Sequence, residues 1–80
     1  MSHESKTPGE MIAFLRNSRA FISQDELAKR VGVTKTTICN WEMGRRFPDL
    51  KYRKLLMEAL DFSRDEQIAF FQAAADQALL

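Results

Sequence analysis

The sequence has one cysteine and one histidine, and it contains no long apolar run. Cys39 has no partner for an internal disulfide. Cys39 and His3 alone cannot form a protein metal site or a cysteine–histidine catalytic pair. No stretch approaches the ~18–20 apolar residues of a membrane-spanning helix, and no signal-peptide pattern is present. We therefore expect a cytoplasmic protein that is not an enzyme and needs no cofactor.

The net charge is only +1, but the charges are distributed unevenly along the 80 residues. Residues 16–54 carry ten basic groups against four acidic ones, whereas residues 55–80 carry one basic group against five acidic ones. The central part of the chain is therefore cationic and its last part is acidic. A polyanion is the partner that such a cationic part favours. The alternative is a set of solvated helix faces whose charges happen to cluster.

Capping signals divide the chain into five expected helices, and no strand pattern appears between them. Most helix starts carry a side chain that accepts hydrogen bonds from the first turn, and two helix ends carry glycine. The starts are Thr7, Ser23, Thr34, Pro48-Asp49 and Ser63, and the ends are Gly32 and Gly44. The length allows one small domain. We expect an all-α domain over residues 7–80, preceded by a disordered arm at residues 1–6.

Three of these starts have the pattern of a capping box, in which a hydroxyl and a glutamate three residues later each bond a backbone N–H. The pairs are Thr7 with Glu10, Ser23 with Glu26, and Ser63 with Glu66.

The last helix is expected to bury a stripe formed by Ile68, Phe71, Ala75 and Ala78. Its apolar residues exceed what one stripe of a small core needs, so we expect this helix to support a homodimer. The residues concerned are Ile68, Phe70, Phe71, Ala74, Ala75, Ala78 and Leu79.

The segment Gln24–Met43 has the pattern of two helices joined by a tight turn. Ala28 is small where the two axes must approach closely, and Gly32 provides the turn. Ile38 and Trp41 lie three residues apart and can both face the core. This pattern resembles the helix-turn-helix of DNA-binding regulators.

A more specific signal is the stretch Ile38–Pro48, which reads ICNWEMGRRFP. It is similar to the Ile-Ser-x-Trp-Glu-x-Gly-x-x-x-Pro stretch of the Cro/repressor-type family of prokaryotic regulators (Xre-like, lambda-repressor-like). The resemblance covers about residues 9–62 and implies a five-helix lambda-repressor-like DNA-binding domain, with the helix-turn-helix formed by helices 2 and 3. It also implies that Glu42 pairs with an arginine on the first helix, for which Arg16 is the candidate. The stretch Leu15–Gln24 is one residue longer than in the family and lacks its glycine, so the first connection is not specified.

The recognition helix, about residues 34–43, is expected to enter the major groove. At 100° per residue, Thr36 and Asn40 point away from the core when Ile38 faces it, and Lys35 flanks them. Asparagine can pair with adenine through two hydrogen bonds, a threonine methyl can contact that of thymine, and lysine can reach guanine. We therefore expect base contacts from Lys35, Thr36 and Asn40, at positions where the family also makes them.

Phosphate contacts are expected on either side of the recognition helix. They are assigned to Gln24, Thr37, Arg45, Arg46 and Lys51. The family uses the glutamine that matches Gln24 in this way, at a helix N-terminus where backbone donors and the dipole attract an anion. Arg53 and Lys54 either extend the basic surface or are ordinary surface charge. A structural role is expected for Ala28, Gly32, Ile38, Trp41 and Glu42.

Two sulfur-containing residues lie on the flank of the recognition helix. Cys39 is either a redox-sensitive thiol or, as we favour, a small residue near the edge of the core. Met43 is interpreted as an exposed residue at the helix end with no role in a site.

Together, these patterns predict a transcriptional regulator that binds double-stranded DNA sequence-specifically. We expect it to be a repressor of a bacterium or phage that associates with the nucleoid. It is expected to bind a pseudo-palindromic operator as a homodimer, away from membranes. The alternative is an antitoxin-type protein-interaction module whose main partner is another protein, contacted through the acidic last helix. The chain is either a complete small regulator or the N-terminal domain of a longer one.

Overall fold

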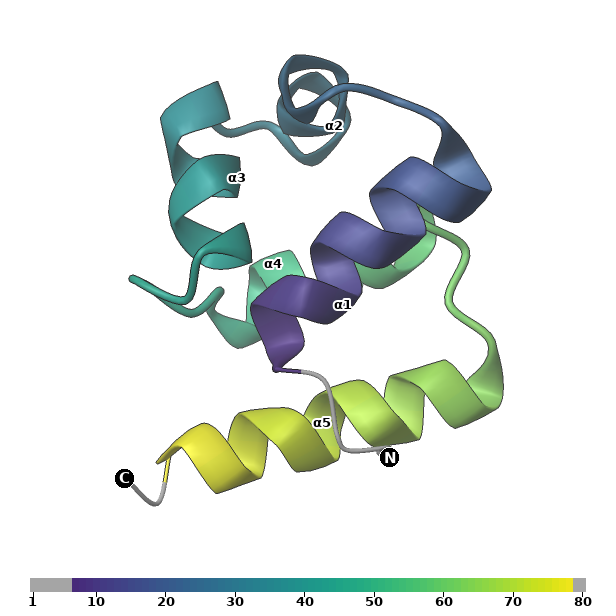
Figure 1. The fold of residues 1–80 in the computed structure, drawn as a ribbon, viewed down its shortest axis with the longest axis vertical. Helices are drawn as coiled ribbons and strands as arrows, with labels where there is room; N and C mark the ends of the chain where they lie inside the picture. Colours follow the sequence, from purple (N-terminus) through teal and green to yellow (C-terminus); the bar gives the residue numbers. More distant parts are fainter. Residues whose placement is uncertain (1–6, 79–80) are drawn as a thin grey trace.

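The computed structural model describes residues 7–78, apart from the side chains of residues 74 and 76–78. These residues form five α-helices and one π-helical turn and contain no strand (Figure 1). The elements are α1 (Pro8–Leu15), η1 (Arg16–Ala20), α2 (Gln24–Val31), α3 (Lys35–Glu42), α4 (Leu50–Ala59) and α5 (Arg64–Ala78). The expected all-α architecture with five helices is confirmed. In the described range, no helix is long and apolar enough to cross a membrane. The predicted arm at residues 1–6 lies outside the described residues.

Reciprocal hydrogen bonds close the first turns of α1 and α5, as the capping-box pattern predicts. The Thr7 hydroxyl accepts from the Glu10 amide at 3.1 Å, and the Glu10 carboxylate accepts from the Thr7 amide at 3.0 Å. The Glu66 amide donates to the Ser63 hydroxyl at 3.2 Å, and the Ser63 amide donates to the Glu66 carboxylate at 2.8 Å. Both helices therefore begin where the sequence places their caps.

The start of α2 shows only half of the predicted capping box. The Glu26 amide donates to the Ser23 hydroxyl at 3.0 Å, but the Glu26 carboxylate accepts from Arg30 Nε at 3.3 Å. The full capping box predicted for Ser23 is therefore wrong. The physical reason is competition, because Arg30 offers a charged donor one turn further along the same helix.

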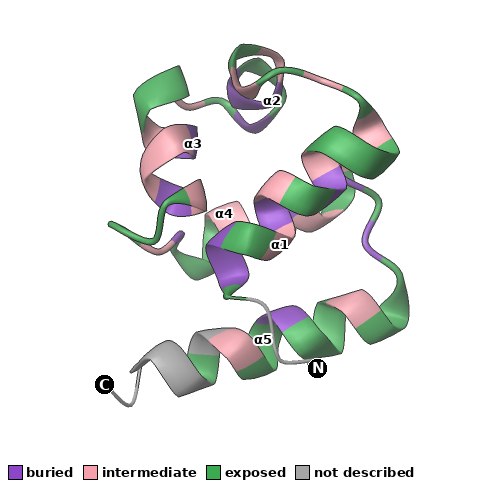
Figure 2. Cartoon of the chain, viewed as in Figure 1, coloured by how far each residue is buried: buried purple, intermediate pink, exposed green. Residues whose placement is uncertain are grey.

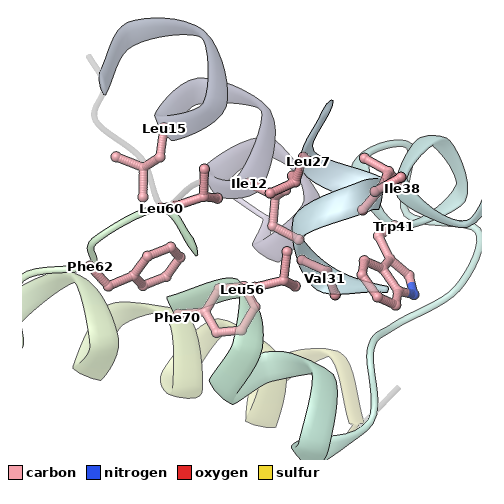
Figure 3. Close-up of a cluster of buried hydrophobic side chains, with 11 residues drawn as sticks. Ile12, Leu15, Leu27, Val31, Ile38, Trp41, Leu56, Leu60, Phe62 and Phe70 are labelled. Atoms are coloured by element: carbon pink, nitrogen blue, oxygen red, sulfur yellow. The ribbon is translucent and has the colours of Figure 1, made fainter. Parts of the chain in front are cut away.

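The hydrophobic core draws on all five helices, with α5 lying across one end of the molecule (Figures 1 and 2). Figure 3 shows the side chains of this cluster, which converge from helices far apart in the sequence. The buried apolar residues are Ile12, Leu15, Leu27, Ala28, Val31, Ile38, Trp41, Leu56, Leu60, Phe62 and Phe70.

The buried side of α5 differs from the predicted one. Phe70 is fully buried, and its ring centroid lies 5.9 Å from that of Phe47 and 5.4 Å from that of Phe62. Ile68 and Phe71, predicted to be buried, are 51% and 40% exposed. At 100° per residue, a helix that turns Phe70 inward turns Ile68 about 160° away from the core. Ala75 is also exposed, and the Ala78 side chain lies outside the described residues.

An ion pair holds the first turn of α5 against η1. Arg19 donates to the Glu66 carboxylate at 2.5 and 2.7 Å and to the Asp61 carbonyl at 2.9 Å. The hydrogen bonds that Glu66 accepts from Arg19, together with the one from the Ser63 amide, lower the pKa of Glu66 to about 2. Glu66 therefore stays ionised at neutral pH, and its contribution to stability is lost only as the pH falls from about 4.5 towards 2.

The connection between α1 and α2 absorbs its extra residue as the π-helical turn η1. Arg16–Ala20 continue α1 with wider turns, and Phe21 then reverses the chain with φ 55°, in the left-handed region. The Phe21 side chain is 79% exposed. An aromatic residue thus occupies a conformation that glycine adopts without strain.

Replacing Phe21 by glycine is expected to raise the free energy of unfolding by up to about 1 kcal/mol. The left-handed conformation costs a residue with a side chain roughly 1–2 kcal/mol, and glycine removes this strain. Glycine also has more freedom in the unfolded chain, which offsets about half of the stability gained. Urea denaturation measures the difference. Phe21→Ala is the matched control, because it removes the same ring but keeps the strain. A glycine variant no more stable than this alanine variant would contradict the explanation.

Candidate nucleic-acid interface

A tight turn sets α2 and α3 at an angle to each other (Figure 1). Gly32 has φ 87°, and its amide and that of Val33 donate to the Ala28 carbonyl at 2.8 and 2.9 Å. The Thr34 hydroxyl then accepts from the Thr37 amide at 3.2 Å and starts α3. Ala28 is buried at the crossing of the two helices. The turn therefore has two features of a helix-turn-helix: a glycine ends the first helix, and a new N-cap residue starts the second.

The inner face of α3 is fixed in the core. Ile38 is fully buried, and the ring of the buried Trp41 lies 5.8 Å from that of Tyr52 on α4. Lys35 and Thr36 are exposed on the first turn of α3 (Figure 2). The structure thus places Ile38 and Trp41 inside and Thr36 outside, as predicted, whereas Asn40, also predicted to point away from the core, is half-buried.

Asn40 lies beside the loop that follows α3 and is half-buried. Its carbonyl accepts from the amides of Arg45 and Arg46 at 2.9 and 3.4 Å. Its side-chain oxygen lies 3.5 Å from Arg45 Nη1, which is long for a hydrogen bond. The amide of Asn40 is therefore held only weakly within the protein.

A glycine on α1 allows the end of α3 to approach α1 closely. A Cβ atom built on Gly9 would lie 2.5 Å from the Glu42 carbonyl oxygen and would also overlap with that of Trp41. Any larger residue would push the two helices apart. This role of Gly9 was not predicted from the sequence, although glycine in the first turn of a helix is unusual because its helix propensity is low.

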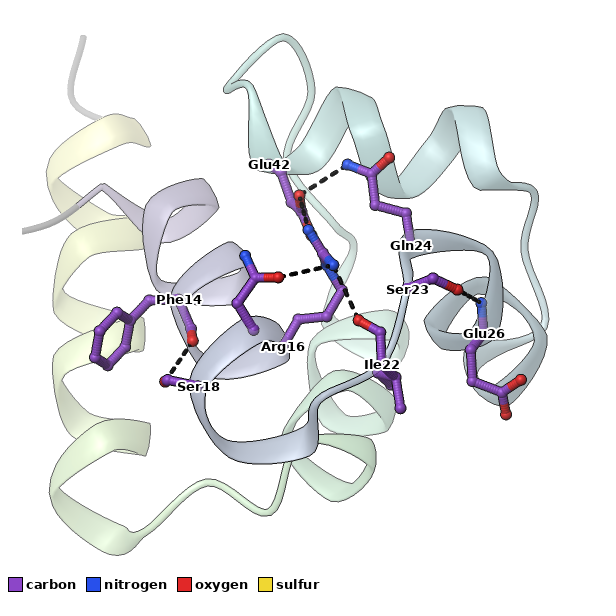
Figure 4. A network of polar contacts seen from close by, with 9 residues as sticks. Phe14, Arg16, Ser18, Ile22, Ser23, Gln24, Glu26 and Glu42 are labelled. Carbon is purple, nitrogen blue, oxygen red and sulfur yellow. Dashed lines mark hydrogen bonds and ion pairs between the residues drawn. The ribbon is translucent and has the colours of Figure 1, made fainter.

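An ion pair between Arg16 and Glu42 joins the end of α1 to the end of α3, as the resemblance implied (Figure 4). Arg16 Nε donates to Glu42 Oε2 at 2.7 Å, and Nη2 donates to Oε1 at 3.1 Å. The side chains are only 12% and 7% exposed. Arg16 Nη1 also donates to the Ile22 carbonyl at 3.0 Å, so the pair fixes the connection that precedes α2. Such a bidentate pair is strongly directional.

Gln24, predicted to contact phosphate, is half-buried and takes part in the same network. Its Nε2 donates to Glu42 Oε1 at 2.9 Å (Figure 4). An amide nitrogen has two protons, so one remains for a second acceptor. Glu42 therefore orients the side chain that was expected to bind DNA.

The basic residues after α3 differ in how strongly they interact with the rest of the protein. Arg45 and Arg46 are exposed in the loop, and Lys51 and Lys54 are exposed on α4. Lys51 Nζ lies 5.5 Å from the Tyr52 ring centroid.

Arg53 is committed to the fold. Its Nε donates to the Pro48 carbonyl at 2.9 Å, and its guanidinium carbon lies 4.7 Å from the Phe47 ring centroid. Arg53 therefore stabilises the start of α4, which neither of the two sequence-based alternatives anticipated.

Two sulfur atoms lie close together on the flank of α3. Cys39 is half-buried, and its Sγ lies 3.8 Å from Met43 Sδ. Among the side chains that the structure describes, no group of three or more metal-ligating residues occurs.

The helix-turn-helix geometry is matched by a comparison with protein families. The family model described as "Helix-turn-helix domain" matches residues 9–71. The chain belongs to this helix-turn-helix family. The matched range runs from α1 into α5 and includes the whole candidate interface, so the chain is a DNA-binding domain of this type. No significant match was found among curated proteins or among solved structures.

Replacing Glu42 by alanine is expected to lower the free energy of unfolding by roughly 3–5 kcal/mol, because Arg16 would remain buried without its counter-ion. Urea denaturation measures the loss. The double variant Arg16→Met with Glu42→Leu removes both charges at similar volume and should recover most of it. If Glu42→Ala were as stable as the parent, the ion pair would not hold the helices together.

Proposed function

We propose that this chain is a Cro/repressor-type transcriptional regulator of a bacterium or phage, which binds double-stranded operator DNA through α3. The observation that carries the proposal is the position of α3. Its inner face and its end are fixed by Trp41 and by the Arg16–Glu42 pair, while its outer face is exposed beside Arg45 and Arg46. A helix held in this way enters the major groove without the cost of ordering it first. A repressor would then act by occupying its operator.

Base contacts are assigned to Lys35, Thr36 and Asn40. Thr36 and Asn40 are four residues apart and therefore lie one above the other on the outer face of α3. The exposed Lys35 lies at the first turn, where it can reach the acceptors of guanine. Asparagine offers one donor and one acceptor, which match N7 and N6 of adenine.

Phosphate contacts are assigned to the residues around α3, where they fix its register on the duplex. The set is Gln24, Thr37, Arg45, Arg46 and Lys51. Gln24 has one remaining amide proton at the start of α2, and the Thr37 hydroxyl lies in the first turn of α3, 2.9 Å from that of Thr34. The exposed cations supply most of the attraction to DNA, because each neutralised phosphate releases counterions.

A homodimer on DNA is supported by the outer face of α5. Ile68 and Phe71 are exposed there, and α5 lies across the molecule with no other described helix covering this face. A two-fold dimer binds half-sites about one helical turn (~10 bp) apart, so the operator would be a pseudo-palindrome.

The second candidate function is an antitoxin-type module that binds a protein partner through the same face. The acidic first turn of α5, with Asp65 beside the exposed Ile68, favours it. Binding to DNA that needs this partner and survives high salt would support the second candidate over the first.

Selection of bound sites from random duplex DNA tests the proposal. The regulator should enrich one pseudo-palindromic sequence without any other protein. Failure to enrich a sequence would contradict the proposed function, and enrichment of an asymmetric half-site would contradict the dimer alone.

Replacing Arg45 and Arg46 by alanine is expected to weaken binding to all DNA sequences by similar factors. Each lost phosphate contact should flatten the slope of log K against log salt by roughly 0.9. Fluorescence anisotropy at several salt concentrations measures the slope. Arg64→Ala, which removes an exposed arginine from α5, is the matched control and should leave the slope unchanged. An unchanged slope in the double variant would show that these arginines do not touch the backbone.

Replacing Asn40 by alanine is expected to weaken binding to the selected operator by about 1–3 kcal/mol, while binding to random DNA stays the same. Thermal stability should hardly change, because the side chain makes only one long hydrogen bond. Trp41→Ala is the contrasting control and should lower stability by about 3–5 kcal/mol, because it empties a core position. If Asn40→Ala kept the same ratio of operator affinity to random-DNA affinity as the parent, Asn40 would not contribute to sequence recognition.

A further inference from the structure

The sulfur atoms of Cys39 and Met43 form an apolar surface on the recognition helix that the proposed base and phosphate contacts do not use. Met43 is 61% exposed, and it is not among the described side chains that pack against the core. Its Sδ lies 3.8 Å from Cys39 Sγ, so the thioether lies beside the thiol on α3. An exposed apolar side chain in this position is free to contact a ligand of the helix.

These two residues share one strip of α3 with Thr36. At 100° per residue, the order around the helix axis, going away from the buried Ile38, is Cys39, Met43, Thr36 and then Asn40. The first three span less than a quarter of a turn, so the thiol, the thioether and the threonine methyl form one line beside Asn40. From Thr36 to Met43 the line is about 10 Å long at 1.5 Å per residue, or about three base pairs at 3.4 Å each.

The chemistry of this strip matches one group in the major groove. The sulfur groups of Cys39 and Met43 carry no charge and form only weak hydrogen bonds, so they can neither hold a phosphate nor read a base edge by strong donors and acceptors. The apolar group that the groove offers is the C5-methyl of thymine. Thymine also pairs with the adenine that Asn40 would read.

We propose that Cys39 and Met43 are specificity residues that contact the 5-methyl groups of thymines next to the base read by Asn40. This inference rests on the proposed function, because it requires that α3 enter the major groove. The thiol and the thioether would each bury one methyl group, and a protein with polar residues there would not prefer thymine at those positions.

Single replacement of each operator thymine by deoxyuridine tests the proposal, because it removes the methyl group and keeps every hydrogen-bonding group. The probe is the duplex selected from random DNA, and affinity is measured by anisotropy. At one or two thymines the parent should lose affinity about fourfold, the factor for burying one methyl group. In Met43→Gln, deoxyuridine should no longer weaken binding at one of these thymines. In Cys39→Ser, the effect should disappear at the second thymine if there are two, or at the same thymine if there is only one.

The controls separate the methyl contact from general effects. Leu50→Gln changes an apolar side chain that is 52% exposed and lies outside α3, and it should keep the full deoxyuridine effect. The proposal is overturned if no deoxyuridine weakens binding, if both sulfur variants keep the parental losses, or if Leu50→Gln abolishes them as well. A selected operator without a methyl effect would overturn this inference alone, whereas failure to select any sequence would overturn the proposed function and the inference with it.

Discussion

The bidentate pair between Arg16 and Glu42 is the interaction on which the rest of the interface depends. Hydrophobic burial attracts α1, α2 and α3 to one another, but it has no direction and would allow α3 to roll. Two charged hydrogen bonds at 2.7 and 3.1 Å permit one arrangement of the helix ends. Burying two charges is costly, and the bonds to the Ile22 carbonyl and the Gln24 amide offset part of that cost. The same network that orients α3 therefore also holds the residue proposed to meet the DNA backbone.

Gly9 provides a steric constraint at the same place. It lets α1 touch the carbonyl oxygens at the end of α3, while Ile38 and Trp41 hold the inner face of that helix. The contacts that stabilise the fold thus involve the inner side and the end of α3, whereas residues on its outer side make few such contacts. A binding site needs this division, because residues free of structural duties can match a ligand while the scaffold keeps them in position.

The sequence predicted the five helices well because most starts carry a capping side chain and the apolar residues of the helices recur at the helical period. Asp49 is the exception among the caps, because its side chain makes no cap hydrogen bond at the start of α4. The sequence also predicted Ile38 and Trp41 inside and Thr36 outside from the same period. It failed where the outcome depends on three-dimensional competition. Arg30 competes for the Glu26 carboxylate, and the choice between Phe70 and Ile68 depends on which side of α5 meets the core. Periodicity identifies apolar residues, but it does not say which neighbour a helix will have.

The turn η1 connects the two parts of the molecule that the proposed function needs. Arg16 and Arg19 lie three residues apart on it, and they bind Glu42 at the end of α3 and Glu66 at the start of α5. Because the pKa of Glu66 is lowered to about 2, its carboxylate stays ionised and the second link persists at neutral pH. Two ion pairs on one short turn also explain how Phe21 is kept at φ 55° against its own preference. Phe21 ends the turn that is tied to both α3 and α5, so this strained turn limits the relative movement of the helix proposed to read DNA and the helix proposed to dimerise.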